Sequence, residues 1–212
     1  MKKFFVLGVL FALPIIAYLF FSSGVNHFAK LPVLSKNIED INRLETLSGK
    51  NISFEDNITV LAFFGDELQE TKGNTFNLDQ KILEKYYEFD DFQFVILLPQ
   101  EARPQAENFV REFSGISNTE KWKFVFAPTD KIQSVFESLN SPYTLDAGSY
   151  SPYVFIIDKE GNLRGRDADE DYGELYGYDS ASVAELSNKM NDDVKVILAE
   201  YRLELKKYKA DR

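Results

Sequence analysis

Residues 58–98 read ITVLAFFGDELQETKGNTFNLDQKILEKYYEFDDFQFVILL and contain the strongest secondary-structure pattern in the chain. Its two ends, residues 58–64 and 92–98, are continuous apolar runs, which is typical of strands buried on both faces of a sheet. Between them lies a helical pattern, whose apolar residues recur three or four positions apart: Leu78, Ile82, Tyr86 and Phe89. A buried strand, a helix and a second buried strand in this order predict an α/β fold.

We expect the helix to begin at Asn77. Asn77 followed by Gln80 resembles a capping box, in which two side chains satisfy backbone N–H groups at the start of a helix. Residues 65–75 then form a loop between the first strand and the helix.

Strand and helix patterns continue to alternate after this stretch. We expect a helix over 101–114, a strand over 122–126, a helix that begins at Thr129 or Asp130, and a hairpin whose strands 153–157 and 162–166 flank a turn at 158–161. A last helix has its apolar residues on one face: Val194, Ile197, Leu198, Tyr201, Leu205 and Tyr208.

Before the opening stretch, residues 42–47 and 51–54 are expected to pair as a small hairpin with Gly49 in its turn. Taken together, the elements predict an α/β sandwich in which helices flank a central mixed sheet.

The composition excludes several kinds of chemistry. The chain has 212 residues, no cysteine and one histidine, His27. It therefore has no disulfide, no thiolate nucleophile and no multi-histidine metal site. We expect no cofactor, and no catalysis by cysteine or histidine in the folded domain. The net charge of −10 argues against nucleic acid as a partner.

The segment from Phe4 to Phe21, FFVLGVLFALPIIAYLFF, is uncharged and almost wholly apolar. As a helix it is about 27 Å long, close to the roughly 30 Å of a bilayer's hydrocarbon core. Lys2 and Lys3 precede it and no basic residue follows before Lys30. The positive-inside rule therefore predicts a single-pass anchor with a cytoplasmic N-terminus.

A cleaved signal peptide is the alternative, and it would give a secreted protein. Signal peptides usually have an apolar region of roughly 7–15 residues that ends at small residues, and residues 20–24, FFSSG, match such a site poorly. In both cases the domain is extracytoplasmic, and periplasmic in a Gram-negative cell. The predicted divisions are an anchor or signal over 1–21, a tether containing His27 over 22–36, and the domain over 37–212.

The order of elements and two short motifs resemble the thioredoxin-like superfamily. The motifs are VLAFFG at 60–65 and SPYVFIIDKEG at 151–161, and the turn at 48–50 also matches. The resemblance covers about residues 40–165 and the last helix. It is greatest to the membrane-anchored Sco/SenC and TlpA-like branches.

In those branches a loop after the first strand carries two cysteines, and the resemblance places these positions at Gln69 and Gly73. It places the copper-binding histidine of Sco proteins near Tyr150, and a cis-proline at Pro152. Gln69, Gly73 and Tyr150 are neither thiol nucleophiles nor soft metal ligands, so redox turnover and Sco-type copper binding are not expected. The resemblance also implies a cis peptide bond before Pro152.

The densest acidic cluster is at residues 167–179. Its alternating aspartates are similar to the first half of a calcium-binding loop, but the glycine comes one position late and Tyr178 stands where glutamate is required. A solvated loop is the simpler interpretation. The candidate ligands are Asp167, Asp169, Asp171 and Asp179. The nearby tyrosines, Tyr172, Tyr176 and Tyr178, either line a recognition surface or pack onto the domain.

Three hypotheses follow. The first is an anchored, redox-inactive domain that acts as an interaction or assembly module at the envelope, with a protein partner. The second is an extracytoplasmic domain that binds calcium or another ligand through residues 167–179. The third is an enzyme with a carboxylate site that no spacing singles out.

Overall fold

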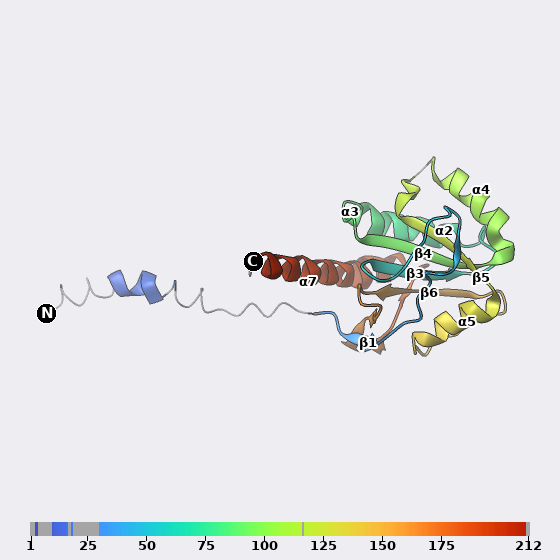
Figure 1. The fold of residues 1–212 in the computed structure, drawn as a ribbon. Helices are drawn as coiled ribbons and strands as arrows, with labels where there is room; N and C mark the ends of the chain where they lie inside the picture. The colour runs from blue at the N-terminus through green and yellow to red at the C-terminus, as the bar shows by residue number, and fades with distance from the viewer. Residues whose placement is uncertain (1–2, 4–9, 17, 19–29, 116, 211–212) are drawn as a thin grey trace.

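The computed structural model describes residue 3, residues 10–16, residue 18, and residues 30–115 and 117–210. These residues form a mixed sheet with helices on both faces, as Figure 1 shows. The sheet has the strand order β1-β7-β6-β3-β4-β5-β2, and β10 also pairs with β6. The predicted α/β sandwich with a central mixed sheet is therefore confirmed.

Three parallel strands lie at the centre of the sheet: β3 (Ile58–Phe64), β4 (Phe92–Pro99) and β5 (Trp122–Ala127). On the other side of β3, β6 (Tyr150–Ile157) runs antiparallel to it. Every residue of β3 and β4 is buried, because helices or loops cover both faces of these strands. The outer strands are short: β1 (Val33–Ser35), β2 (Glu45–Thr46), β7 (Leu163–Arg164) and β10 (Tyr178–Asp179).

The helices divide between the two faces of the sheet. One face packs against the helical segment α2 (Lys72–Leu78), η1 (Asp79–Leu83) and α3 (Glu84–Tyr86), against η2 (Gln100–Ala102) with α4 (Arg103–Phe113), and against η4 (Leu186–Met190) with α7 (Asn191–Ala210). The other face packs against α5 (Thr129–Ser138) and the segment 38–54. The remaining short elements are η3 (Thr119–Lys121), the two-stranded sheet of β8 (Arg166–Asp169) and β9 (Gly173–Leu175), and α6 (Val183–Glu185).

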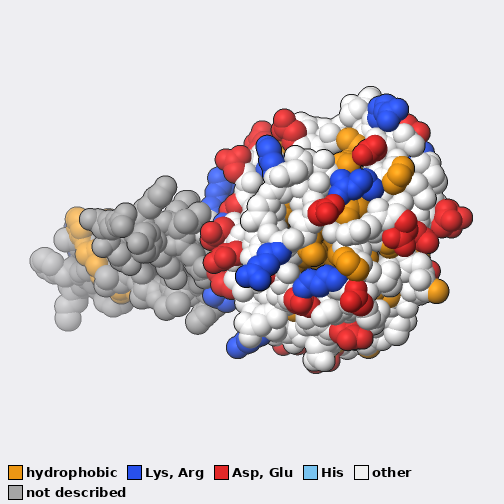
Figure 2. All heavy atoms as spheres, turned by 45° about the vertical axis from the view of Figure 1, so that its right-hand side comes forward, with side chains coloured by type: hydrophobic (Ala, Val, Ile, Leu, Met, Phe, Trp, Pro, Cys, Tyr) orange, Lys and Arg blue, Asp and Glu red, His pale blue; other side chains and the backbone are white. Residues whose placement is uncertain are grey.

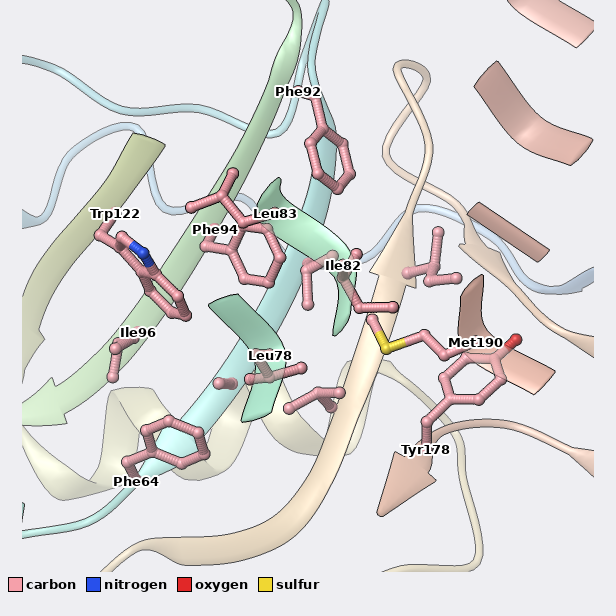
Figure 3. Close-up of a cluster of buried hydrophobic side chains, with 14 of the residues drawn as sticks. Phe64, Leu78, Ile82, Leu83, Phe92, Phe94, Ile96, Trp122, Tyr178 and Met190 are labelled. Carbon is pink, nitrogen blue, oxygen red and sulfur yellow. The ribbon is translucent and has the colours of Figure 1, made fainter. Parts of the chain in front are cut away.

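The core under α2 and α4 is rich in aromatic side chains (Figure 3). The ring of Phe94 lies 4.6 Å from that of Trp122, and Phe113 meets Trp122 edge to face at 6.0 Å. On the β6 side of the sheet, Met190 and Tyr178 pack into the same cluster. Each large apolar side chain buried here stabilises the fold by about 1.5–3 kcal/mol.

The expected hairpin of residues 42–47 and 51–54 is wrong. Residues 45 and 46 form β2, which pairs with Phe126 and Val125 of β5. The turn itself is present, with Gly49 at φ +69°. After it the chain does not return along β2, and the Ser53 carbonyl instead accepts a hydrogen bond from the buried Gln93 side chain at 2.9 Å.

The expected helix start at Asn77 is also wrong. The helix begins at Lys72, and Asn77 lies inside it, where its side-chain amide donates to the Ser180 carbonyl oxygen at 3.2 Å. Gly73 and Thr75 are poor helix formers, so the first turn gives a weak sequence signal. A contact with a distant segment stabilises that turn: the Asn74 side-chain amide donates to the Ser180 hydroxyl at 2.9 Å.

The later elements follow the predictions closely. The predicted helix at 101–114, strand at 122–126 and turn at 158–161 correspond to α4 with its short η2 extension, β5 and the β6–β7 turn. In α7, Val194, Ile197 and Leu198 are buried as expected. The side chains of Leu205 and Tyr208 lie outside the described ones.

Most of the apolar segment 4–21 and His27 lie outside the described residues. Residues 10–16 are helical and exposed. Within the described residues, no helix is long and apolar enough to cross a membrane.

Candidate functional site

The carboxyl end of β3 meets a loop from the opposite half of the chain. Gly65 has φ +66°, and a Cβ atom there would lie 2.8 Å from the Gly148 carbonyl oxygen. The backbone N–H of Asp66 donates to the same oxygen at 3.2 Å. Gly65 therefore allows the loop after β3 to lie directly against the loop before β6.

Asp146 holds that second loop in shape. Its side-chain oxygen accepts hydrogen bonds from the backbone N–H groups of Gly148 and Tyr150, at 2.9 and 2.8 Å. Ser149, enclosed by these bonds, has φ +63°, a conformation that few residues other than glycine adopt. The loop is thus locked by a carboxylate and brings Tyr150 to the start of β6.

Gln69 and Gly73 both lie at the surface on the approach to α2. Gln69 is in the turn before the helix, and Gly73 is the second residue of the helix. A Cβ atom on Gly73 would meet nothing within 4 Å. These two positions offer neither a nucleophile nor a buried polar group, and their surroundings are open.

Asn74, one residue beyond Gly73, is the centre of the polar contacts at this place. Its side-chain amide donates to the Ser180 hydroxyl at 2.9 Å and reaches the Tyr150 hydroxyl at 3.5 Å. The Ser180 hydroxyl in turn donates to the Pro152 carbonyl oxygen at 2.6 Å, and the Ser180 N–H donates to the same oxygen at 2.9 Å. The structure therefore brings Tyr150 and Pro152 to the first turn of α2 through Asn74 and Ser180.

The peptide bond before Pro152 is trans, since no cis peptide bond occurs in the described residues. The expectation of a cis bond was wrong. Pro152 lies inside β6, and its carbonyl oxygen accepts the Ser180 N–H just after β10.

Tyr150 is suited to hydrogen bonding and not to ionisation. Partial burial raises the pKa of its hydroxyl, and the carboxylates of Asp179 and Asp146 raise it further, whereas the hydrogen bond with Asn74 lowers it. The hydroxyl therefore stays protonated at neutral pH. The protonated Tyr150 hydroxyl can form hydrogen bonds but is not a soft ligand of the kind that binds copper.

The acidic segment 167–179 folds around the chain's own cations. Lys189 donates to Asp169 at 2.6 Å and to Asp171 at 2.7 Å, and Arg166 pairs with Asp169 at 3.2 Å. Burial raises the pKa of the Asp169 carboxyl, but the hydrogen bond and positive charge of Lys189, together with hydrogen bonds from the backbone N–H groups of Asp171 and Tyr172, outweigh burial and hold that pKa below its ordinary value. Lys189 thus occupies the place between the two carboxylates.

The four candidate ligands are not brought together. Asp167 is exposed, and the Asp179 carboxylate accepts a hydrogen bond from the Ala181 N–H at 2.9 Å. Across the described parts of the chain, no group of three or more histidine, aspartate or glutamate side chains is arranged to hold a metal ion. The tyrosines divide: Tyr178 is buried, with its hydroxyl 2.7 Å from the Asp193 carboxylate, whereas Tyr172 is exposed.

No protein-family model matches the chain, and no curated protein matches its sequence. Solved structures do match its fold. BsSco, a member of the Sco family of cytochrome c oxidase assembly proteins, has a TM-score of 0.56 and 12% identity, over 78% of this chain and 94% of that one. The chain has a thioredoxin-like fold.

Two further structures with this thioredoxin-like fold come from Aquifex aeolicus. A putative electron transfer protein matches with a TM-score of 0.54 and 14% identity, over 77% of this chain and 97% of that one. A putative electron transport protein matches with a TM-score of 0.52 and 16% identity, over 77% and 96%. The thioredoxin-like domain of this chain has no cysteine, so it has no dithiol redox chemistry.

Nothing in the sequence indicates the roles of Asn74 and Ser180. Asn74 and Ser180 are 106 residues apart, and neither belongs to a motif with a known spacing. Asp146 followed by Gly148 is a turn signal, and that pattern was the one available clue to the locked loop.

Proposed function

We propose that the chain is a membrane-anchored, redox-inactive thioredoxin-like domain that acts as an interaction or assembly module at the cell envelope. The anchor is residues 4–21, preceded by Lys2 and Lys3. The domain faces outward from the cytoplasmic membrane, which means the periplasm in a Gram-negative cell. Cleavage near Ser23 would instead release it as a secreted protein.

One observation carries the proposal. At the approach to α2, where the resemblance places two cysteines, the chain keeps the scaffold but has exposed Gln69 and Gly73. Asn74, Ser180 and Pro152 are hydrogen-bonded to one another beside these two positions. The surface is thus well ordered and has no reactive group, which suits recognition of a partner and not catalysis.

A role in assembly is supported by the kind of protein that shares the fold. BsSco is described as a member of a family of cytochrome c oxidase assembly proteins. This likeness is one of fold, and the chain here lacks the cysteines of the dithiol branches. We infer that the chain binds a partner protein through the surface around residues 66–74.

Charge reversal on this surface tests the proposal. Glu67 and Glu70 are exposed beside Gln69, so Glu67→Lys with Glu70→Lys changes the surface without disturbing the core. The matched control is Glu88→Lys with Glu107→Lys, two exposed carboxylates elsewhere. The full chain is purified from detergent-solubilised membranes with its bound proteins.

We expect one partner to copurify with the wild type and the control, and to be lost with the Glu67/Glu70 variant. Copurification that is unaffected by the Glu67/Glu70 change would contradict the binding surface. Disulfide reductase activity of the purified wild-type chain would contradict redox inactivity.

A further inference from the structure

A cavity of about 810 Å³ lies at the end of the sheet opposite Gly65. It opens at the amino ends of β4 and β5, beside Phe92, Trp122 and the turn after β2. Phe92 pairs with Ile58 at the start of β3, whereas Gly65 follows its last residue. The cavity is therefore separate from the surface around Gln69.

Three lysines line this cavity: Lys50, Lys121 and Lys123. Two carboxylates, those of Asp90 and Glu120, also line it, so its charged side chains sum to +1 in a chain of net charge −10. Figure 2 shows how acidic and basic side chains otherwise alternate over one face of the molecule. A cationic cavity in an acidic protein attracts anions that the rest of the surface repels.

None of the three lysines forms an ion pair with any described residue. The Nζ of Lys121 donates to the carbonyl oxygens of Phe89 and Asp90, at 2.6 and 3.2 Å. The Nζ of Lys123 donates to the Glu120 carbonyl oxygen. An ammonium group has three protons, so both lysines are held in place by neutral acceptors and keep protons to donate.

Lys50 is set at the mouth of the cavity by the turn around Gly49. The Thr46 hydroxyl donates to the Lys50 carbonyl oxygen at 2.7 Å, which closes the turn. The Glu120 carboxylate also lines the cavity, and it accepts a hydrogen bond from the Tyr87 hydroxyl at 3.0 Å.

The three charges act on one another. Burial lowers the pKa of Lys123, and the positive charges of Lys121 and Lys50 lower it further, although Glu120 opposes them. The cavity thus holds like charges that repel, and a bound anion would offset that repulsion.

The rest of the lining suits a small organic anion. Apolar side chains of Phe92, Phe124 and Val110 form part of the wall. The side chains of Asn51 and Thr119 also line it and hydrogen-bond to no other described residue, so they are available to a ligand. The volume lies within the roughly 300–1,000 Å³ of small-molecule sites and exceeds what a single inorganic ion fills.

We propose that this cavity binds a small multivalent oxyanion, either a phosphate ester or a polycarboxylate, through Lys50, Lys121 and Lys123. Lysine binds such groups as a point charge and does not require a bidentate geometry, so the same three lysines can bind either a phosphate ester or a polycarboxylate. The proposal is independent of the surface around Gln69.

Calorimetric titration of the full chain in detergent at low ionic strength tests the site, with pyrophosphate and citrate as probes. The variant is Lys50→Gln, Lys121→Gln and Lys123→Gln together. The control variant removes three positive charges outside the cavity: Lys36→Gln, Lys81→Gln and Lys195→Gln together. We expect the first triple variant to weaken binding by at least about tenfold and the control to bind as the wild type does.

Binding of pyrophosphate alone would identify a phosphate ester as the natural ligand class, and binding of citrate alone a polycarboxylate. No binding of either probe, or equal binding by the two triple variants, would overturn the proposal. If the first triple variant did not fold, Lys50→Gln alone would replace it, because Lys50 is exposed in a turn. We then expect a several-fold loss of affinity, and no loss would overturn the proposal.

Discussion

The side-chain amide of Asn74 donates to the Ser180 hydroxyl at 2.9 Å, and this bond joins the first turn of α2 to the end of β10. Ser180 is fully buried and donates onward to Pro152. The contact therefore links three segments that are far apart in the sequence, beside Gln69 and Gly73.

Asn74→Ala tests that link. We expect a loss of about 1–2 kcal/mol in the free energy of unfolding, because the buried Ser180 hydroxyl loses a donor. Asn108→Ala on α4 is the control, since Asn108 is exposed and alanine is the better helix former. Urea unfolding followed by the fluorescence of Trp122 measures both variants, and equal stabilities would contradict the role of Asn74.

Gly65→Ala and Gly73→Ala are expected to act in opposite directions. At Gly65 the positive φ and the 2.8 Å approach to the Gly148 oxygen leave no room for a methyl group, and the loss is about 1–3 kcal/mol. At Gly73 the methyl group meets no atom and favours the helix, for a gain of about 0.5–1 kcal/mol. Thermal unfolding of both variants measures this, and a destabilised Gly73→Ala would show that the helix start is wrongly placed.

Asp169 makes the stability of the domain sensitive to acid. Its carboxyl pKa is lowered from an ordinary value of 3.8, so the folded state favours the charged form. The stabilisation is complete above about pH 4 and is lost as the pH falls through the folded-state pKa. Asp169→Asn is expected to cost about 1–3 kcal/mol at neutral pH and to flatten the acid branch of the stability curve.

The control for that prediction is Asp167→Asn, because Asp167 is exposed two residues away. Urea midpoints measured between pH 3 and pH 7 compare the variants. An unchanged acid branch in Asp169→Asn would show that the contacts with Lys189 do not set the acid response.

Deletion of residues 1–21 tests the predicted anchor. We expect the full chain to sediment with membranes and to resist extraction by high salt, whereas the shortened chain stays in the supernatant. Carbonate extraction followed by immunoblotting measures the difference. If the chain expressed from the complete sequence is instead soluble and begins near Ser23, a cleaved signal peptide is indicated.

The sequence was most informative where burial is complete. The runs that became β3 and β4 are apolar at nearly every position, because both faces of these strands are covered, and their positions were predicted within one residue. The face of α7 was equally clear, since Val194, Ile197 and Leu198 repeat at helical spacing.

Prediction was wrong where a distant segment decides the local structure. β2 pairs with β5 and not with its neighbour in sequence, and no residue of the Gly49 turn indicates that choice. The start of α2 was missed because Gly73 and Thr75 have low helix propensity and the stabilising contacts come from elsewhere in the fold. Asn74 and Ser180 were not predicted for the same reason: their contact joins two segments that are distant in the sequence and meet only in the folded chain.

Photo-crosslinking from the surface before α2 tests the central claim most directly. A photoreactive amino acid at Gln69 in the full chain, irradiated in intact cells, is compared with one at Glu107, an exposed position on α4. We expect a discrete adduct with one protein from position 69 and none from position 107. No adduct from position 69, or the same adducts from both positions, would contradict a binding surface at this site.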